Sequence, residues 1–411
     1  MKRTSVLLAG AVAAMFLVCG AVLAQSQPTI DVHPPDRYIV VLKEGASDPG
    51  RAANGMAQRY DLGVGFVYSH ALKGFSATIP DGHLEKVRAD ERVDYVERDS
   101  TMSAVGQTLP WGVNRVDADT SSTIAGNGSG VVSNVNAYVI DSGIDGTHPD
   151  LNVEGHVDCL AADCKGKALD TSYKNYDCYG HGTHVAGTLA AKDNAMDVVG
   201  VAPGALLVDV RVLNCNGGGP TSTILAGIDW VTANARTPAV ANLSLSGPAN
   251  QSVDDAVRNS ADSGILYSVA AGNNGKPACN YSPARAGREN VDGRWKKNNG
   301  IVTTAATIRR KKTDPPTVVN NSEWPNSNYG ACVDLWAPGK DILSTKLDGG
   351  TETLSGTSMA SPHVGGGGAL YLSHTSASPS GVETALKDAA WRPGTKSKDG
   401  SSILLENVEP F

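Results

Sequence analysis

The chain has 411 residues, a length that suits two folded domains and additional processing segments better than one average domain. Apolar residues make up 41% of the chain and charged residues 19%, which favours a compact globular protein and excludes a disordered or coiled-coil one. The net charge of −7 gives no general attraction to nucleic acid or to an anionic membrane. We therefore expect neither as a partner.

Residues 1–24 have the layout of a secretory signal peptide. A basic pair near the start precedes an apolar run over residues 6–23, and small residues end this segment at Ala24, after which cleavage is expected. A lipoprotein anchor at Cys19 is the alternative, but Val18 stands where such sites need a small residue. No later stretch is apolar for long enough to span a bilayer. We expect secretion to the extracellular space, or to the periplasm.

A compact unit of alternating elements is predicted after a polar linker over residues 25–36. Its sequence favours strands over residues 38–42, 74–79 and 93–96, and helices over residues 51–60 and around Leu84 and Val87. This alternation predicts a small α+β sandwich of the split βαβ kind.

From Met102 onward the chain is rich in glycine, and strand-like apolar runs alternate with helical segments. The predicted strands cover residues 138–141, 206–213, 239–245, 265–271 and 301–306, and the predicted helices cover residues 184–191, 223–233, 253–260 and 358–373. Strands separated by helices predict an α/β fold, in which a doubly wound parallel sheet carries helices on both faces.

Six cysteines remain once Cys19 is set aside. An even number in an exported protein indicates three disulfides, although the spacing alone leaves fifteen pairings open. A structural zinc site is the weaker alternative, because no second close pair matches the one at positions 159 and 164. The six are Cys159, Cys164, Cys178, Cys215, Cys279 and Cys332.

Two segments place a carboxylate and a histidine where catalysis could use them. Asp141 ends a predicted strand, at the sheet edge where open α/β folds bind ligands, although an Asp there also caps helices or forms turns. His181 begins a predicted helix between two glycines. With His184 it could also bind a metal, but no Glu lies between them and no third ligand is near. We expect His184 to be a structural residue.

A third segment places Ser358 at the start of the last predicted helix. A serine there is also an ordinary N-cap, but the free amides of a helix N-terminus can stabilise an oxyanion as well. The chain order of Asp141, His181 and Ser358 is the order found in subtilisin.

The motifs around these three residues resemble those of the subtilisin-like serine peptidases, and in particular of the proteinase K and aqualysin branch. Residues 109–112, 212–217, 270–274 and 327–330 agree with that branch, and the resemblance covers nearly all of residues 104–411. It implies a subtilisin-like fold and a secreted serine endopeptidase that needs no cofactor for catalysis. Asp141, His181 and Ser358 would be its catalytic triad, and Asn273 with the backbone amide of Ser358 would form the oxyanion hole.

The resemblance also implies where a substrate lies. Two backbone edges would hold it as an extended strand, and an uncharged wall would favour an apolar or aromatic side chain before the cut, with broad specificity. Ser246 stands where the proteinase K pattern has glycine and is expected to narrow the neighbouring subsites. The implied substrate-binding residues are Gly217, Gly218, Gly219, Leu245, Ser246, Gly247, Ala270, Ala271 and Gly272.

Disulfides and calcium follow from the same resemblance. It implies the pairs Cys178–Cys215 and Cys279–Cys332, which leaves Cys159 and Cys164 to close a local loop. Asp334 corresponds to a calcium ligand of the family, but a polar insertion over about residues 288–299 falls where its partner carbonyls are expected. A second family-like calcium site would lie near Asn114 and Asp117.

Residues 25–103 are expected to be a propeptide, with an inhibitor-like fold over residues 37–102. In the family this domain assists folding, lays its last strand in the cleft and is cut off by the enzyme itself. Here that strand would be residues 96–102, and the peptidase domain would begin near Ala104 and run to residue 411. We expect a monomer whose partners are protein and peptide substrates and its own propeptide.

Two other functions are less consistent with the residues present. A processing protease specific for dibasic sites would need acidic residues in the pocket segments, which are lacking. A catalytically inert binding or inhibitory module usually loses a triad or oxyanion residue, and none is lost here.

Four consecutive glycines, residues 365–368, stand in the helix after Ser358, where the family pattern is Ala-Gly-apolar-Ala. Glycine inside a helix costs about 0.5–1 kcal/mol relative to alanine, so a loosened helix is predicted. Changing Gly365 and Gly368 to alanine should then raise the inactivation temperature, unless close packing demands glycine there.

Overall fold

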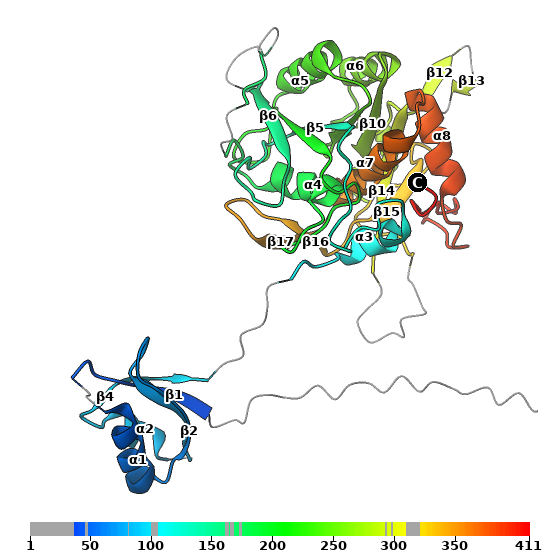
Figure 1. Cartoon of the computed structure of the whole chain (residues 1–411). Coiled ribbons are helices and arrows are strands. Elements are labelled where there is room, and N and C mark those ends of the chain that lie inside the picture. Colours follow the sequence, from blue (N-terminus) through cyan, green and yellow to red (C-terminus); the bar gives the residue numbers. More distant parts are fainter. Residues whose placement is uncertain are drawn as a thin grey trace, which may run out of the picture. The chain divides into compact units, whose positions relative to one another are not determined.

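The computed structural model describes residues 37–45, 48–80, 82–99, 106–160, 164, 168–171, 175–291, 294–296, 299–309 and 321–411. They belong to two compact units, one ending at residue 104 and the other starting at residue 105 (Figure 1). The predicted signal peptide, the linker, the end of the inhibitory strand and the processing site near Ala104 lie outside the described residues. Within those residues, no helix has the length and hydropathy needed to cross a membrane.

The N-terminal unit is a four-stranded antiparallel sheet with two helices. Its strands lie in the order β2-β3-β1-β4, and buried Val40, Met56 and Phe75 contribute to its core. The predicted α+β fold is confirmed, whereas β2 was not predicted because two glycines and mostly exposed side chains hide its pattern. The elements are β1 (Arg37–Leu42), α1 (Pro49–Tyr60), β2 (Gly63–Tyr68), β3 (Gly74–Thr78), α2 (Leu84–Arg88) and β4 (Val93–Arg98).

The C-terminal unit is built on a seven-stranded parallel sheet, which confirms the predicted doubly wound fold. Its order is β15-β14-β10-β8-β5-β7-β6. The two edge strands, β6 and β15, were not predicted. The strands are β5 (Asn136–Asp141), β6 (Val153–Asp158), β7 (Leu206–Arg211), β8 (Ala239–Leu243), β10 (Ile265–Ala270), β14 (Ile301–Thr307) and β15 (Leu335–Pro338).

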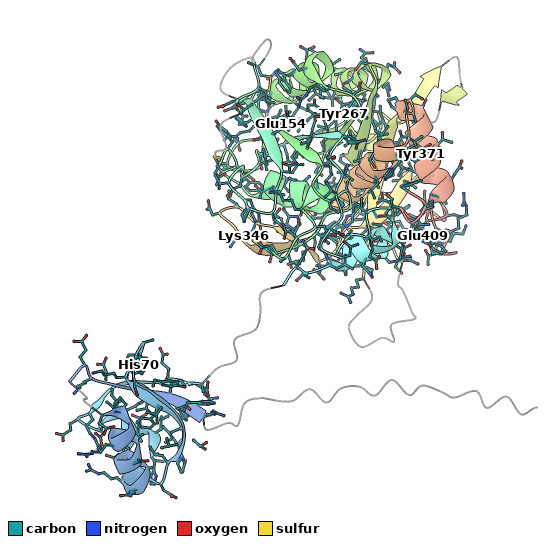
Figure 2. The ribbon with its side chains drawn as sticks, viewed as in Figure 1. His70, Glu154, Tyr267, Lys346, Tyr371 and Glu409 are labelled. Carbon is teal, nitrogen blue, oxygen red and sulfur yellow. A yellow bond between two sulfur atoms is a disulfide. The ribbon has the colours of Figure 1, made fainter. Side chains whose placement is uncertain are left out.

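Helices cover both faces of this sheet (Figure 1). Leu266 packs in the same core as α4 (His181–Ala190), α7 (Thr357–His374) and α8 (Pro379–Ala389). Its neighbour Tyr267, labelled in Figure 2, belongs to the opposite core with α5 (Thr221–Asn234) and α6 (Gln251–Asp262). Adjacent residues of β10 thus face opposite helical layers, as the alternation of a strand requires.

The remaining elements are short and lie outside the central sheet. They are α3 (Trp111–Arg115), β9 (Gly247–Pro248), β11 (Tyr281–Ser282), β12 (Glu289–Val291), β13 (Arg294–Lys296), β16 (Ile342–Thr345) and β17 (Thr351–Leu354), with single turns of 3-10 helix at Ala118–Thr120 and Ala278–Asn280.

Three disulfides hold loops of the C-terminal unit together. They join Cys159 to Cys164, Cys178 to Cys215, and Cys279 to Cys332. These are the pairs that the family resemblance implies.

Candidate active site

The first two expected catalytic residues meet at the carboxyl end of β5. Asp141 is the last residue of this strand and is buried, and its Oδ1 accepts a hydrogen bond of 2.8 Å from Nδ1 of His181. His181 is the first residue of α4. Gly182 permits this approach, because a Cβ there would lie 2.1 Å from the carbonyl oxygen of Gly143. The start of α4 therefore packs directly on the loop after Asp141.

The surroundings of His181 favour its charged form. Burial by itself lowers the pKa of an imidazole, but the charge and the hydrogen bond of Asp141 outweigh it, so the pKa of His181 is raised. Because Nδ1 is bound to Asp141, Nε2 is the ring nitrogen that remains for proton transfer.

Asp177, which the sequence analysis did not single out, closes the N-terminus of α4. Its Oδ1 accepts hydrogen bonds from the amides of Tyr179 and Gly180, both 3.0 Å long. Its Oδ2 accepts from the amide and the hydroxyl of Thr183, at 3.1 and 2.6 Å. A buried carboxylate thus holds the turn that leads into His181, in the manner of a helix cap. The position of Asp177, four residues before the helix, was the sequence feature that could have predicted this role.

Ser358 is the second residue of α7 and lies at the end of β8. Its hydroxyl donates to the carbonyl of Ser244 at 3.1 Å, and its own carbonyl accepts from the Ser244 hydroxyl at 2.7 Å. Within the described part of the chain, no hydrogen bond joins Ser358 to His181. Catalytic hydrogen bonds often form only when substrate binds, so this geometry is compatible with a nucleophile at rest.

Asn273 follows β10 and presents its amide nitrogen beside Ser358. Its Oδ1 accepts from the amide and the hydroxyl of Thr357, at 2.9 and 2.8 Å, which leaves Nδ2 as the donor. A Cβ built on Gly356 would lie 3.2 Å from Nδ2 of Asn273 and 3.5 Å from the backbone nitrogen of Ser358. Two donors therefore converge on a space that any side chain at position 356 would fill.

These groups open into one cleft of about 950 Å³, which His181, Asn273 and Ser358 all line. Of the substrate-binding residues expected from the sequence, only Ala271 does not line it. Ala271 is buried, and its carbonyl accepts from Nδ2 of Asn328 at 2.8 Å. The expected residues that do line the cleft are Gly217, Gly218, Gly219, Leu245, Ser246, Gly247, Ala270 and Gly272.

Comparison with known families agrees with this geometry. Residues 133–406 match the family described as "Subtilase family", and residues 37–104 match "Peptidase inhibitor I9". The chain belongs to the subtilase family of serine endopeptidases. The resemblance noted from its motifs, including that of its N-terminal domain, is thereby confirmed.

Individual relatives of this subtilase match over most of its length. Extracellular serine proteinase of Thermus sp. (strain Rt41A) is 38% identical, over 89% of this chain and 88% of that protein. Proteinase R of Parengyodontium album is 34% identical, over 80% and 78%. Alkaline serine exoprotease A of Vibrio alginolyticus is 38% identical over 88% of this chain, but the chain spans only 65% of that protein's length.

A solved structure gives the same result for the fold. The crystal structure of a cold-adapted subtilisin-like serine proteinase is 36% identical, with a TM-score of 0.57, and covers 72% of this chain and 97% of its own. The subtilisin-like fold expected from the sequence is therefore confirmed.

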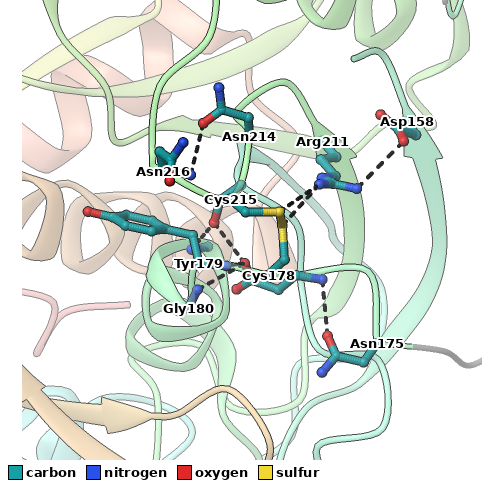
Figure 3. Close-up of a disulfide and its surroundings, with 12 residues drawn as sticks. Asp158, Asn175, Cys178, Tyr179, Gly180, Arg211, Asn214, Cys215 and Asn216 are labelled. Carbon is teal, nitrogen blue, oxygen red and sulfur yellow. Dashed lines mark hydrogen bonds and ion pairs between the residues drawn. A yellow bond between two sulfur atoms is a disulfide. The ribbon is translucent and has the colours of Figure 1, made fainter. Parts of the chain in front are cut away.

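Tyr179 lines the cleft of this subtilase and was not predicted from the sequence. Its side chain is exposed, lines the cleft and has its ring centre 6.4 Å from that of His181. A Cβ on Gly217 would lie 2.5 Å from the Tyr179 ring, so glycine is needed for this contact. The disulfide between Cys178 and Cys215 ties the loop that carries Tyr179 to the loop that carries Asn214 and Asn216 (Figure 3). Gly217 is the next residue of the second loop.

The other histidine of the motif, His184, is buried away from the cleft. Its Nε2 donates to the carbonyl of Ile342 at 3.0 Å, and burial lowers its pKa to about 4, so it is neutral at pH 7. Among the described residues, no group of three or more Cys, His, Asp or Glu side chains is arranged to hold a metal. These contacts support the structural role expected for His184.

The environment of Asp334 does not fit a calcium ion. Its Oδ1 is 2.9 Å from Nζ of Lys387, and its Oδ2 accepts the backbone amide of Thr303 at 3.1 Å. A calcium ion at Oδ1 of Asp334 would have to displace the ammonium group of Lys387, because two cations at this separation repel each other.

The second expected calcium site has protein partners as well. Asn114 donates to Asp119 at 2.8 Å, and Asp117 accepts from Nε1 of Trp391 at 2.7 Å.

Proposed function

We propose that this subtilase is a secreted endopeptidase that hydrolyses peptide bonds of proteins through a covalent acyl-enzyme on Ser358. The observation that supports this most directly is the hydrogen bond between buried Asp141 and His181, because His181 lines the same cleft as Ser358. Asp141, His181 and Ser358 would act as the triad.

In the proposed reaction, Oγ of Ser358 attacks the scissile carbonyl carbon while Nε2 of His181 takes the hydroxyl proton. Asp141 orients the ring and stabilises the imidazolium that forms. For this step the hydroxyl turns away from the carbonyl of Ser244, which needs rotation about one side-chain bond. His181 then gives the proton to the leaving amine, and water hydrolyses the acyl-enzyme.

The oxyanion of the tetrahedral intermediate would bind between Asn273 and the start of α7. Nδ2 of Asn273 and the backbone amide of Ser358 are the two donors next to the space at Gly356. The amides of the first helical turn have no partner inside the helix, so they can bind the developing charge.

We expect the substrate to lie as an extended strand between residues 217–219 and residues 245–247. The side chain before the cleaved bond would enter the space beside Ala270 and Gly272. Glu352 supplies the one carboxylate among the described residues that line the cleft. A basic side chain of the substrate would therefore gain little electrostatic attraction there. An apolar or aromatic residue is expected, with broad specificity.

Tyr179 would bound the adjacent subsite. Successive side chains of an extended strand point to opposite sides, so the residue before the one in the pocket would face His181 and Tyr179. The aromatic ring narrows this side of the cleft, which favours small or flat side chains there.

The N-terminal unit would serve as inhibitor and folding aid until the enzyme removes it. This proposal is supported by its match to the inhibitor family and by the exposed apolar residues Phe66 and Tyr95, which a partner surface could cover. Residues 96–102 would lie in the cleft, and cleavage near Ala104 would release the enzyme. The apolar N-terminal segment would direct the precursor to secretion.

A serine-directed fluorophosphonate tests the proposed reaction. The purified wild-type protein should become labelled at Ser358, and Ser358→Ala should not. Ser373→Ala is the matched control, because Ser373 lies near the other end of the same helix and its hydroxyl only bonds the carbonyl of Leu370. Folded wild-type protein that stays unlabelled would exclude the proposed nucleophile.

A further inference from the structure

A buried cluster of three charged side chains joins α8 to the central sheet. Glu383 and Lys387 lie one turn apart on α8, and Asp334 directly precedes β15. Nζ of Lys387 lies 2.9 Å from Oδ1 of Asp334 and also contacts Oε1 of Glu383. The side chains are only 16% exposed for Lys387, 8% for Asp334 and 0% for Glu383, so solvent screens these charges little and each needs an opposite charge close by.

The remaining oxygen atoms of the two carboxylates hold the start of β14. Oε2 of Glu383 accepts the amide of Gly300 at 2.9 Å, and Oδ2 of Asp334 accepts the amide of Thr303 at 3.1 Å. Both carboxylates are therefore bound on one side by the backbone and on the other by a single cation. The cluster fastens three segments that are distant in the sequence.

An ammonium group and a divalent cation exclude each other at this position. Calcium is bound by six to eight oxygen atoms at about 2.3–2.6 Å, and Lys387 offers donors only. Nζ of Lys387 contacts an oxygen atom of each carboxylate, so it already occupies the position between Asp334 and Glu383. The carboxylates of Asp334 and Glu383 together carry two negative charges, which a divalent cation would neutralise.

We infer that the ammonium group of Lys387 is a built-in counter-ion, which takes the place of a divalent cation between Asp334 and Glu383. This part of the fold is then held together without calcium. The inference does not depend on the proposed catalytic reaction, because it concerns only the packing of α8 on the sheet.

Calcium binding to the full chain tests this inference. The experiment uses the Ser358→Ala background, in which proteolysis cannot interfere, and counts bound calcium ions per chain by calorimetric titration with CaCl₂. Adding Asp334→Asn should leave the count unchanged. Adding Lys387→Ala should raise it by one ion, since it frees both carboxylates. Lys340→Ala, which breaks an exposed ion pair with Asp341, is the control and should bind as its parent does.

Thermal unfolding gives a second measurement. Replacing EGTA by calcium should raise the melting temperature of the Lys387→Ala protein by several degrees more than that of its parent. The reason is that an ion that binds only the folded state stabilises it by mass action. A count that falls by one ion in Asp334→Asn, or that does not rise in folded Lys387→Ala, would overturn the inference. If Lys387→Ala does not fold even in calcium, the Asp334→Asn count decides alone.

Discussion

Two helices of this subtilase carry expected catalytic residues at their N-termini, and the surroundings of the backbone amides differ between these two N-termini. At α4, the carboxylate of Asp177 accepts the free amides and fixes the turn before His181. At α7, Gly356 has no side chain, and the space beside Ser358 and Asn273 stays open.

The difference teaches how one local property can serve two purposes. Every helix begins with amides that have no partner in the helix. At α4 these donors are used inside the protein to position the residue that follows them. At α7 Oδ1 of Asn273 accepts the amide of Thr357, and we propose that the next amide, that of Ser358, stabilises the charge that develops during the reaction.

The largest expected effect comes from removing the proposed nucleophile at the N-terminus of α7. Ser358→Ala should abolish peptidase activity, and it should accumulate as a precursor that lacks only its signal peptide, because cleavage near Ala104 needs the same triad. Gel electrophoresis and N-terminal sequencing of the protein secreted by a protease-free host measure this. A fully trimmed Ser358→Ala protein would contradict self-processing.

The next effect concerns the proposed oxyanion hole at the same helix end. Asn273→Ala should lower kcat by about 100- to 1,000-fold, as loss of the equivalent donor does in subtilisin, and should leave KM nearly unchanged. Steady-state kinetics with a peptide substrate separate the two constants. A rise in KM at unchanged kcat would instead assign Asn273 to ground-state binding.

A smaller effect is expected from weakening the contacts of Asp177 at the N-terminus of α4. Asp177→Asn should lower kcat/KM by about 10- to 100-fold, because it loosens the turn that places His181. Loss of the nearby negative charge also lowers the pKa of His181, which Asp177 helps to raise. Since His181 must be neutral to accept a proton, the acid limb of the pH profile of kcat/KM should move to lower pH.

Asp193→Asn is the matched control for Asp177. Asp193 also accepts backbone amides, those of Gly126, Gly128 and Gly130, but it lies after the C-terminus of α4 and not at the start that carries His181. Its replacement should lower stability and leave the acid limb in place. An acid limb that moves equally in both variants would show that general loosening, not the charge beside His181, is responsible.

Below α7, a buried carboxyl makes stability depend on pH. Neither carboxyl oxygen of Glu406 has a hydrogen-bond partner among the described residues, and burial raises the pKa of Glu406 well above its ordinary value. A raised pKa means that the folded state keeps a proton that the unfolded chain releases. The contribution to stability is therefore complete below about pH 4.5 and decreases by about 1.4 kcal/mol per pH unit above it, until Glu406 ionises in the folded state.

Glu406→Gln tests this dependence, because the amide cannot ionise. In the Ser358→Ala background, its melting temperature relative to that of its parent should rise as the pH increases above about 5, until Glu406 ionises in the folded parent. Glu409→Gln, at an exposed position nearby, should show no such trend. A constant difference across this range would mean that the carboxyl of Glu406 has a partner and is ionised.

The sequence was sufficient for features that depend on local patterns. The buried strands β5, β8, β10 and β14 are mostly apolar runs, and their carboxyl ends meet at one edge of a parallel sheet, which explains why Asp141 could be proposed before the fold was known. The family motifs added Asn273 and the catalytic roles expected of His181 and Ser358. Their catalytic roles remain proposals.

Features that arise from contacts between distant segments were not predictable. Lys387 reads as a surface lysine on an amphipathic helix until folding brings Asp334 next to it. Tyr179 gains its place in the cleft only because Gly217, on another loop, accepts its ring. The edge strand β6 is mostly buried, but its apolar pattern is too weak to stand out because Glu154, His156 and Asp158 interrupt it.

The smallest expected effects concern the glycines inside α7, and here the structure argues against part of the expectation from sequence. A Cβ on Gly368 would lie 2.2 Å from Cδ2 of buried Leu266, whereas one on Gly365 would lie 3.2 Å from Cδ1 of Leu189. Gly368→Ala must displace Leu266 in a close-packed core, which costs about 1–3 kcal/mol and outweighs the helix-propensity gain of about 0.5–1 kcal/mol. Gly365→Ala needs only a slight shift of a methyl group, so its net effect should lie within about 0.5 kcal/mol of zero. Melting temperatures of the two single variants in the Ser358→Ala background measure the difference. Stabilisation by both alanines would show that helix propensity, and not packing against the sheet, sets the stability of the helix that carries Ser358.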